Sequence, residues 1–565
     1  MRFLTKKQHQ KIILLYLIMV ISNIAIQLST DAVVSLDSWT IYHIVESIIK
    51  QQEILPRAIL YTFYPLSYLP LVPAAALTST LESIKFFYPL ISSLFIIPLY
   101  GLTTLSLRRG QFSATLTIAL ITDFFLRAVA ATPQGIGLIF FFSALYFLKK
   151  NRGGLFLVSG IGLILTHHLT ALVLVIWTAA HLLQQLYEIE DKKQEKAVVA
   201  FMLLFTLDWF IVSYLSGKNV ESAFLLIKLL PTTIALLALI IFSKKYQLRI
   251  LKKIELVPEK YIMITTIAAL TLFFTFLFTF STHSFLSTHG LWSFFFIPVY
   301  IVAPIFGLTT LLRQKNKTKL LFSIFLAAGF TLIIVLRLNC IFDAYRLLPF
   351  MLIPLIIAAY NRNKNLGKLL LVLAVFTLIL HGAANFSRLT YTTGEKEAAY
   401  YARDHLAAAT VATDTKLSAL FLGLSHMPAT FEGSYWLFTQ RDLAPWIKTF
   451  NRYRFQSYPI RYIAISQSML EKGADISWSS LYQKIPTEQL DSFDQVGERI
   501  FSNGEVIIWQ IDENIINNAA ELEMKAPSSS LAENITTLIS GKKAAEPAGE
   551  PTINPQQAYG STCGN

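Results

Sequence analysis

The chain has 565 residues, of which 54% are hydrophobic and 15% are charged, and its mean hydropathy is +0.52. This composition excludes an ordinary soluble globular protein and is typical of a chain that crosses a membrane many times. The formal net charge of +13 lies mostly in short polar connections between apolar stretches, so it indicates membrane topology and contact with anionic lipid, and no binding of nucleic acid.

Lysine and arginine clusters recur along the chain at spacings that leave room for two apolar spans between neighbouring clusters. A span of about 15–22 apolar residues can cross a hydrocarbon layer about 30 Å thick. If every cluster is cytoplasmic, the chain makes about thirteen crossings, with its N-terminus inside and everything after about residue 386 outside the cell. We expect these spans at 12–28, 87–106, 112–130, 134–148, 154–166, 169–186, 198–215, 222–242, 261–280, 291–311, 320–337, 346–360 and 369–385.

One apolar stretch, 64–80, is left out of this count. It is rich in proline, and counting it as a crossing would place Arg108 and Arg109 outside and invert every later connection. We therefore expect it to lie in the outer interface or to re-enter the membrane from outside. The first external loop then runs from about residue 30 to 86, within a transmembrane domain that covers 1–390.

This loop contains Asp37, a carboxylate that can have a structural or a chemical role. Asp37 stands at the position of an N-cap, just before an amphipathic helical pattern that carries His43 and Glu46. Asp37 can cap an interfacial helix, act as a general base or bind a divalent cation, and a structural and a chemical role can hold together.

Several short motifs lie along the same part of the chain. Residues 37–43 read Asp-Ser-Trp-Thr-Ile-Tyr-His, residues 64–66 read Tyr-Pro-Leu, residues 125–130 read Phe-Leu-Arg-Ala-Val-Ala, and 166–169 read Thr-His-His-Leu. Residues 37–43 resemble the Asp-Pro-Trp-like motif that opens the first external loop in the catalytic subunit of oligosaccharyltransferase, and residues 64–66 resemble the Tyr-Pro motif that closes it. Residues 125–130 resemble the Ser-Arg-Ser-x-Ala-Gly run that ends the third span of that subunit. Residues 166–169 resemble its turn between spans five and six. That enzyme is a GT-C glycosyltransferase.

The resemblance covers about residues 10–520 and implies a GT-C fold, a sugar donor linked to a polyprenyl phosphate, and transfer on the outer face. Three family features are missing. The metal-binding Asp-x-Glu pair is replaced by Thr132-Pro133-Gln134, the Trp-Trp-Asp-Tyr-Gly acceptor motif is absent, and the loop 281–289 lacks an acidic residue. The resemblance thus implies a relative that transfers a sugar to a different acceptor, with dependence on Mg²⁺ or Mn²⁺ left open. His43 and Gln134 are candidates for its substrate site.

Charged residues at membrane depth are costly and often functional. Arg346 opens the twelfth expected span, where its guanidinium can fork onto the phosphate of the lipid donor, as an arginine at a similar place does in the family, or can snorkel beside Asp343. Asp123 and Arg127 are spaced to pair along one helix face. Alternatively, Asp123 is a second catalytic carboxylate that faces Asp37, and Arg127 binds the lipid phosphate.

The expected external turn between the fifth and sixth spans carries His167 and His168. An imidazole there can donate to a phosphate or relay a proton, so both histidines are candidates for the substrate site. No third ligand stands at a spacing that would complete a metal site with them.

The C-terminal part predicts an external α/β domain over 391–525. Helical patterns at 395–406, 415–424, 435–450 and 477–484 alternate with strand-like runs at 409–412, 429–431 and 461–465, and a hairpin turned by Asn503-Gly504 follows. The tail 526–565 is rich in Ser, Ala, Pro and Gly, and we expect it to be disordered.

Together these features predict a multi-pass protein of the cell membrane that transfers a sugar from a polyprenyl-phosphate donor to a glycan, lipid or protein acceptor. Two alternatives stay open: a transporter or flippase of lipid-linked sugars, and a non-catalytic protein with the GT-C fold. A flippase would be expected to show an inverted repeat of broken helices, and the sequence shows none.

Overall fold

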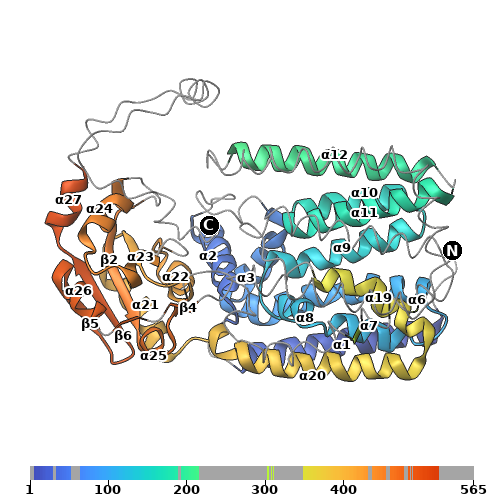
Figure 1. The fold of residues 1–565 in the computed structure, drawn as a ribbon, viewed down its shortest axis with the longest axis horizontal. Helices are drawn as coiled ribbons and strands as arrows, with labels where there is room; N and C mark the ends of the chain where they lie inside the picture. Colours follow the sequence, from blue (N-terminus) through green and yellow to red (C-terminus); the bar gives the residue numbers. More distant parts are fainter. Residues whose placement is uncertain are drawn as a thin grey trace, which may run out of the picture. The chain divides into compact units, whose positions relative to one another are not determined.

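The computed structural model describes residues 5–29, 33–51, 64–188, 192–215, 302–303, 307, 310, 348–430, 435–452, 458–475, 482–483, 485–486 and 488–520. The chain divides into two compact units, Met1–Thr390 and Tyr391–Asn565 (Figure 1). The first is helical, and the second contains both helices and a sheet.

Long helices of the first unit run side by side (Figure 1). Helix α12 packs on α10 and α11, α10 packs on α9, α9 packs on α6, and α7 packs on α6, α19 and α20. The helices are α1 (Lys6–Leu28), α2 (Leu36–Gln51), α3 (Val72–Leu77), α4 (Thr80–Glu82), α5 (Tyr88–Ser92), α6 (Ile96–Ser106), α7 (Gln111–Ala119), α8 (Thr122–Val129), α9 (Pro133–Lys149), α10 (Gly153–Ile164), α11 (His168–Glu188), α12 (Lys192–Leu215), α19 (Leu348–Arg362) and α20 (Lys364–Leu389). Short 3₁₀ and π turns join some of them: η2 (Pro65–Ser67), η3 (Leu69–Leu71), η4 (Ser83–Phe87) and η5 (Ser93–Phe95).

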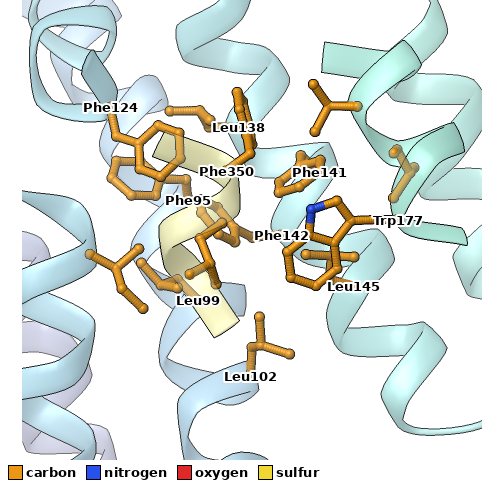
Figure 2. Close-up of a cluster of buried hydrophobic side chains, with 14 of the residues drawn as sticks. Phe95, Leu99, Leu102, Phe124, Leu138, Phe141, Phe142, Leu145, Trp177 and Phe350 are labelled. Atoms are coloured by element: carbon orange, nitrogen blue, oxygen red, sulfur yellow. The ribbon is translucent and has the colours of Figure 1, made fainter. Parts of the chain in front are cut away.

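Aromatic side chains hold the centre of this unit together (Figure 2). The ring of Phe350, on α19, lies 4.9 Å from both Phe124 on α8 and Phe141 on α9, edge to face in each case. Phe141 also meets Trp177 on α11 edge to face. Such pairs add about 0.5–1.5 kcal/mol each to the area they bury. They therefore bring α19 against helices more than two hundred positions earlier in the chain.

Two described helical segments, Lys6–Leu28 and Thr80–Ser106, are long and apolar enough to cross a bilayer. The structure does not confirm about thirteen crossings, because the other apolar helices found among the described residues are shorter. The expected spans 222–242, 261–280 and 320–337 lie outside the described residues, as does most of 291–311. The shorter apolar helices within the described part of the first unit are Pro65–Leu77, Pro133–Lys149, Gly153–Ile164, His168–His181, Pro349–Asn361 and Asn365–Ile379.

The third expected span, 112–130, is wrong as a single helix. Helix α7 ends at Ala119 and α8 begins at Thr122, with the backbone of Ile121 outside the helical range at ψ 124°. The break falls where β-branched Ile121 and Thr122, which have low helix propensity, precede Asp123, a residue type favoured in the first turn of a helix. Helix α8 is therefore a separate short element.

The second unit is built on a four-stranded sheet with the order β1-β2-β6-β5. β1 and β2 are parallel, and the other neighbours are antiparallel. The strands are β1 (Thr410–Ala412), β2 (Ile460–Ser466), β5 (Gly497–Ser502) and β6 (Val506–Ile511). The predicted turn joins β5 to β6, with Gly504 at φ +86° and the Asn503 side chain accepting from the Val506 amide at 2.9 Å. The prediction of an α/β unit is confirmed.

Several local predictions in this unit are wrong. The single helix at 435–450 is two helices, α23 (Tyr435–Thr439) and α24 (Ala444–Arg452), separated at the polar 440–443 segment. The predicted strand 429–431 makes only an isolated bridge, at Ala429 to Val411. The predicted helix 477–484 overlaps a two-residue strand, β4 (Tyr482–Gln483), which pairs with β3 (Ala474–Asp475); residues 476–481 and 484 lie outside the described part.

The remaining helices of the second unit lie along its sequence between and beside the strands. Three of them were missed by the sequence patterns because each is only six to eight residues long: α25 (Gln467–Lys472), α26 (Gln489–Val496) and α27 (Glu513–Ala520). The predicted helices are α21 (Thr393–His405) and α22 (Thr415–Leu420), the second continued by a π turn, η8 (Phe421–Ser425). The expected disordered tail 526–565 lies outside the described residues.

Candidate functional site

The candidate site is built around the C-terminal end of α8, which is buried. The last carbonyl groups of a helix have no partner within it, and leaving them unpaired in the interior is costly. Two fully buried side chains supply donors: Ser92 donates to the Ala128 carbonyl at 2.7 Å, and Gln27 of α1 donates to the Val129 carbonyl at 2.7 Å. The end of α8 is thus fixed to α5 and α1.

A third side chain, Tyr88 of α5, completes this arrangement. Its hydroxyl lies 2.8 Å from the Thr132 carbonyl and 3.2 Å from the Arg127 carbonyl, and it accepts from the Thr132 amide at 3.2 Å. Gly135, in the first turn of α9, lies directly over these groups, so that an added Cβ would overlap both the Tyr88 hydroxyl and the Arg127 carbonyl. Helices α8 and α9 therefore meet at backbone contact.

The start of α2 is held to the same place. Ser38 donates to the Val34 carbonyl at 2.6 Å and accepts from the Ala131 amide at 2.8 Å, which links α2 to the segment just after α8. The Gln27 side chain that donates to α8 also accepts from the Val34 amide at 3.3 Å. Ser35, just before the helix, takes a left-handed conformation at φ +86°. These contacts set where the first turn of α2 stands relative to α8.

Across this junction, Asp37 and Arg127 form an ion pair. Arg127 Nη1 lies 3.1 Å from Asp37 Oδ2, and the side chains are 20% and 11% exposed, respectively. The two residues are ninety positions apart, and the fixed ends of α2 and α8 bring them together. A carboxylate in the first turn of a helix is also favoured by the helix dipole.

The prediction that Asp37 is an N-cap is wrong. Helix α2 begins at Leu36, so Asp37 is its second residue and its carboxylate faces Arg127. The cap position, Ser35, falls two residues earlier than expected, at the point where the chain turns with a positive φ. The sequence spacing predicted that Arg127 pairs with Asp123. In the described part of the structure, Arg127 forms an ion pair with Asp37. The side chain of Asp123 lies outside the described residues, so its predicted role stays a prediction.

The two predicted histidines lie on another side of α9. His167 Nδ1 is 2.7 Å from the Thr170 hydroxyl and accepts from the Thr170 amide at 3.2 Å, so it caps the start of α11. The His168 ring stacks on Tyr64 with centroids 5.1 Å apart. The amide of Leu66 donates to the Leu165 carbonyl at 3.2 Å, which docks the Tyr-Pro motif of the first loop on this turn.

Helix α9 separates the ion pair from the histidine turn. Gly135 faces the Arg127 carbonyl, whereas Gly137 faces His167. Two residues along a helix correspond to a rotation of about 200°, so the two clusters flank α9 on opposite sides. Gln134 lies between them on the same first turn and is 4% exposed.

A further predicted site residue, His43, is not brought to the ion pair. His43 follows Asp37 by six positions on α2, a rotation of about 240°, so its side chain leaves the helix in a different direction. Glu46 lies on the face opposite Asp37, where it accepts from Thr80 at 2.7 Å and pairs with Lys50. Arg346 lies outside the described residues.

Four residues of the site were not singled out in the sequence: Gln27, Ser38, Tyr88 and Ser92. Gln27 carried a usable signal, since an amide inside an otherwise apolar span must find partners at membrane depth. Nothing in the sequence distinguishes Ser38, Tyr88 and Ser92 from the other residues of their segments. Their role appears only in the structure, in the hydrogen bonds around the end of α8.

No protein-family model and no curated protein matches the chain. Among solved structures, the chain is similar to the oligosaccharyltransferase of Archaeoglobus fulgidus bound to zinc and sulfate, with a TM-score of 0.46, 13% identity, and coverage of 80% of this chain and 68% of the other. The archaeal oligosaccharyltransferase AglB from the same organism, in complex with an inhibitory peptide and a dolichol-phosphate, gives a TM-score of 0.47, 12% identity, and coverage of 80% and 69%. These similarities are distant, so the functional proposal rests on the site residues.

Proposed function

We propose that the protein is a membrane glycosyltransferase of the GT-C type, which moves a sugar from a polyprenyl-phosphate donor to an acceptor on the outer face. The observation that carries the proposal is the Asp37–Arg127 ion pair, in which a carboxylate and a guanidinium from distant helices are held 3.1 Å apart and only partly exposed. It coincides with two of the motifs that resemble the oligosaccharyltransferase family, residues 37–43 and 125–130.

A membrane location is supported by the apolar side chains that the first unit leaves exposed. Ile21 on α1, Val158 on α10, Leu203 on α12 and Val372 on α20 are each between 64% and 66% exposed. Apolar faces of this kind on several long helices suit contact with lipid chains.

The proposed topology places the N-terminus and Arg108 inside, and residue 390 onward outside. Single cysteines introduced near position 108 and near position 400 of an otherwise cysteine-free chain test it with a membrane-impermeant maleimide. We expect labelling from outside only near position 400. Labelling near 108 with protection near 400 would refute the topology.

In the proposed reaction, the oxygen of an acceptor hydroxyl bonds to the anomeric carbon while the bond from that carbon to the lipid phosphate oxygen breaks. The phosphate leaves with the electron pair, and Asp37 takes the hydroxyl proton. Arg127 holds the carboxylate in place and offers a fixed positive charge beside the departing phosphate. Arg346 is proposed to bind the lipid phosphate, and Asp123, His43, Gln134, His167 and His168 remain candidates for the surrounding site.

Asp37→Asn tests the proposed base. We expect turnover of a polyprenyl-phosphate sugar by the purified protein to fall about 10²- to 10⁴-fold, the usual worth of a positioned general base. Glu82→Gln is the matched control, because Glu82 is an exposed carboxylate of the same first loop. Its turnover should equal that of the wild type.

A double variant separates chemistry from folding. Asp37→Asn leaves Arg127 without its ion pair, whereas Asp37→Asn/Arg127→Gln removes both charges together. We expect the double variant to regain stability relative to the single one and to stay inactive. Full activity in Asp37→Asn would exclude Asp37 as the base. Donor that crosses the bilayer without being consumed would indicate a flippase, and donor that binds without either change would indicate a non-catalytic protein.

Arg346→Ala tests the proposed phosphate contact. A charge-assisted bidentate contact is worth about 1.5–3 kcal/mol, so donor affinity should fall roughly ten- to a hundredfold. Arg346→Lys should restore only part of it, since an ammonium cannot fork onto two phosphate oxygens. Unchanged donor binding in Arg346→Ala would leave Arg346 as a membrane anchor.

A further inference from the structure

The residues around Asp37 do not fit the divalent metal ion that the Asp-x-Glu pair helps to bind in the family that the sequence resembles. Divalent metals in such sites are held by several carboxylate or imidazole groups. Within the described ranges, no group of three or more His, Cys, Asp or Glu side chains is placed to hold a metal ion. At the position of the family's acidic pair stands Gln134, a neutral amide.

Charge gives a second reason. The carboxylate of Asp37 is already matched by the guanidinium of Arg127, 3.1 Å away. A divalent cation bound to Asp37 would sit within a few ångströms of that guanidinium, and both positive charges would share one carboxylate in a site that is largely shielded from water. Arg127 cannot relieve the repulsion by losing its proton, because arginine stays charged in proteins.

The backbone that carries Arg127 is also held in place. The carbonyl groups of the last turn of α8 are held by the side chains of Tyr88, Ser92 and Gln27, and Gly135 of α9 lies against its backbone. The guanidinium is therefore carried by a backbone that hydrogen bonds and close packing hold in place. It is the positive charge that the fold places beside Asp37.

We propose that Arg127 is a built-in counter-ion that takes the place of a divalent metal beside Asp37, so that this centre works without one. The part of this inference that concerns catalysis rests on the proposed glycosyltransferase function. The part that concerns metal binding does not. It is a property of this chain and departs from the metal-binding acidic pair of the family that the sequence resembles.

Metal binding is measured first, without substrate. Full-length protein in detergent, stripped with EDTA and dialysed, is titrated with Mn²⁺ and bound ion is followed by electron paramagnetic resonance. We expect no site tighter than about 1 mM, the weak limit of protein sites for divalent cations. Should an ion bind elsewhere, Asp37→Asn will not change its affinity, and the inference stands. One Mn²⁺ per chain, bound tighter and lost in Asp37→Asn, overturns it.

Donor turnover is measured second. We expect donor turnover to be the same, within about twofold, in EDTA and in added Mn²⁺ or Mg²⁺, because a fixed guanidinium supplies the charge. Arg127→Lys should keep more turnover than Arg127→Gln, and Arg152→Gln, which changes an exposed arginine between α9 and α10, should leave it unchanged. Turnover that requires a divalent ion and is lost in EDTA refutes the inference. A complete absence of turnover with every lipid donor contradicts the proposed function instead, and the Mn²⁺ titration still decides whether Asp37 holds a metal.

Discussion

Gly135→Ala should disturb the site although it adds a single methyl group. A Cβ at this position would overlap the Tyr88 hydroxyl and the Arg127 carbonyl oxygen, and it would lie 3.1 Å from the Arg127 carbonyl carbon. The Arg127 groups belong to the backbone, so relief requires the end of α8 to move. Overpacking costs about 1–3 kcal/mol, and loss of the Tyr88 hydrogen bonding costs about 1 kcal/mol more. Alanine gains up to about 1 kcal/mol over glycine in a helix, which leaves a net loss of about 1–3 kcal/mol.

The matched control is Gly154→Ala in the first turn of α10, where an added Cβ has no atom within 4 Å. We expect this variant to be unchanged or slightly more stable. Equilibrium denaturation of the detergent-solubilised full chain gives both free energies of unfolding. Donor turnover should fall in Gly135→Ala alone, because the shifted backbone carries Arg127 away from Asp37. Equal stability of the two alanine variants would refute the close approach of α8 and α9.

Two predictions concern the second unit. Lys416→Met should cost about 3–5 kcal/mol in the free energy of unfolding, because it leaves the carboxylate of Glu395, which is 1% exposed and 2.9 Å from Lys416 Nζ, without its partner; adding Glu395→Gln should recover part of the loss, and equal stability of the single and double variants would contradict this. The hydrogen bonds from the Arg499 guanidinium hold the pKa of the Asp494 carboxyl below its ordinary value, so the pair stabilises the fold above about pH 4 and loses this effect as the pH falls through the folded pKa. The difference in unfolding free energy between wild type and Asp494→Asn should be about 0.2–1 kcal/mol at pH 7, since both side chains are exposed, and should shrink below pH 4; a constant difference from pH 3 to 7 would disprove the assignment.

The parts of the fold that the sequence predicts well depend on neighbours in the chain. The β5–β6 hairpin is an example, since Asn503-Gly504 supplies the positive φ and the side-chain acceptor that a tight turn needs. Helices α9, α10, α11 and α12 were likewise expected from apolar stretches bounded by polar or basic residues. Their existence depends on patterns within about twenty residues.

The breaks and starts of short helices were harder to place. The split between α7 and α8 was missed because the stretch 112–130 is mostly apolar, and Thr122 and Asp123 interrupt it only weakly. The start of α2 was misplaced by two residues, since Ser35 takes a left-handed backbone that no residue type demands there. Errors of this size matter at the site, because two residues on a helix turn a side chain by about 200°.

The ion pair shows why the candidate site was only half visible in the sequence. Asp37 and Arg127 were both singled out, but Arg127 was offered to Asp123, four positions away, because spacing along a helix is the only neighbour relation that a single sequence displays. Their meeting depends instead on the buried carbonyl groups at the end of α8, which had to find donors and found them on α1 and α5. Gln27 serves both sides of this junction, donating to Val129 and accepting from Val34. The need to pair the carbonyl groups at the end of one short helix therefore places a carboxylate beside a guanidinium. The chemistry proposed for the site depends on this structural requirement.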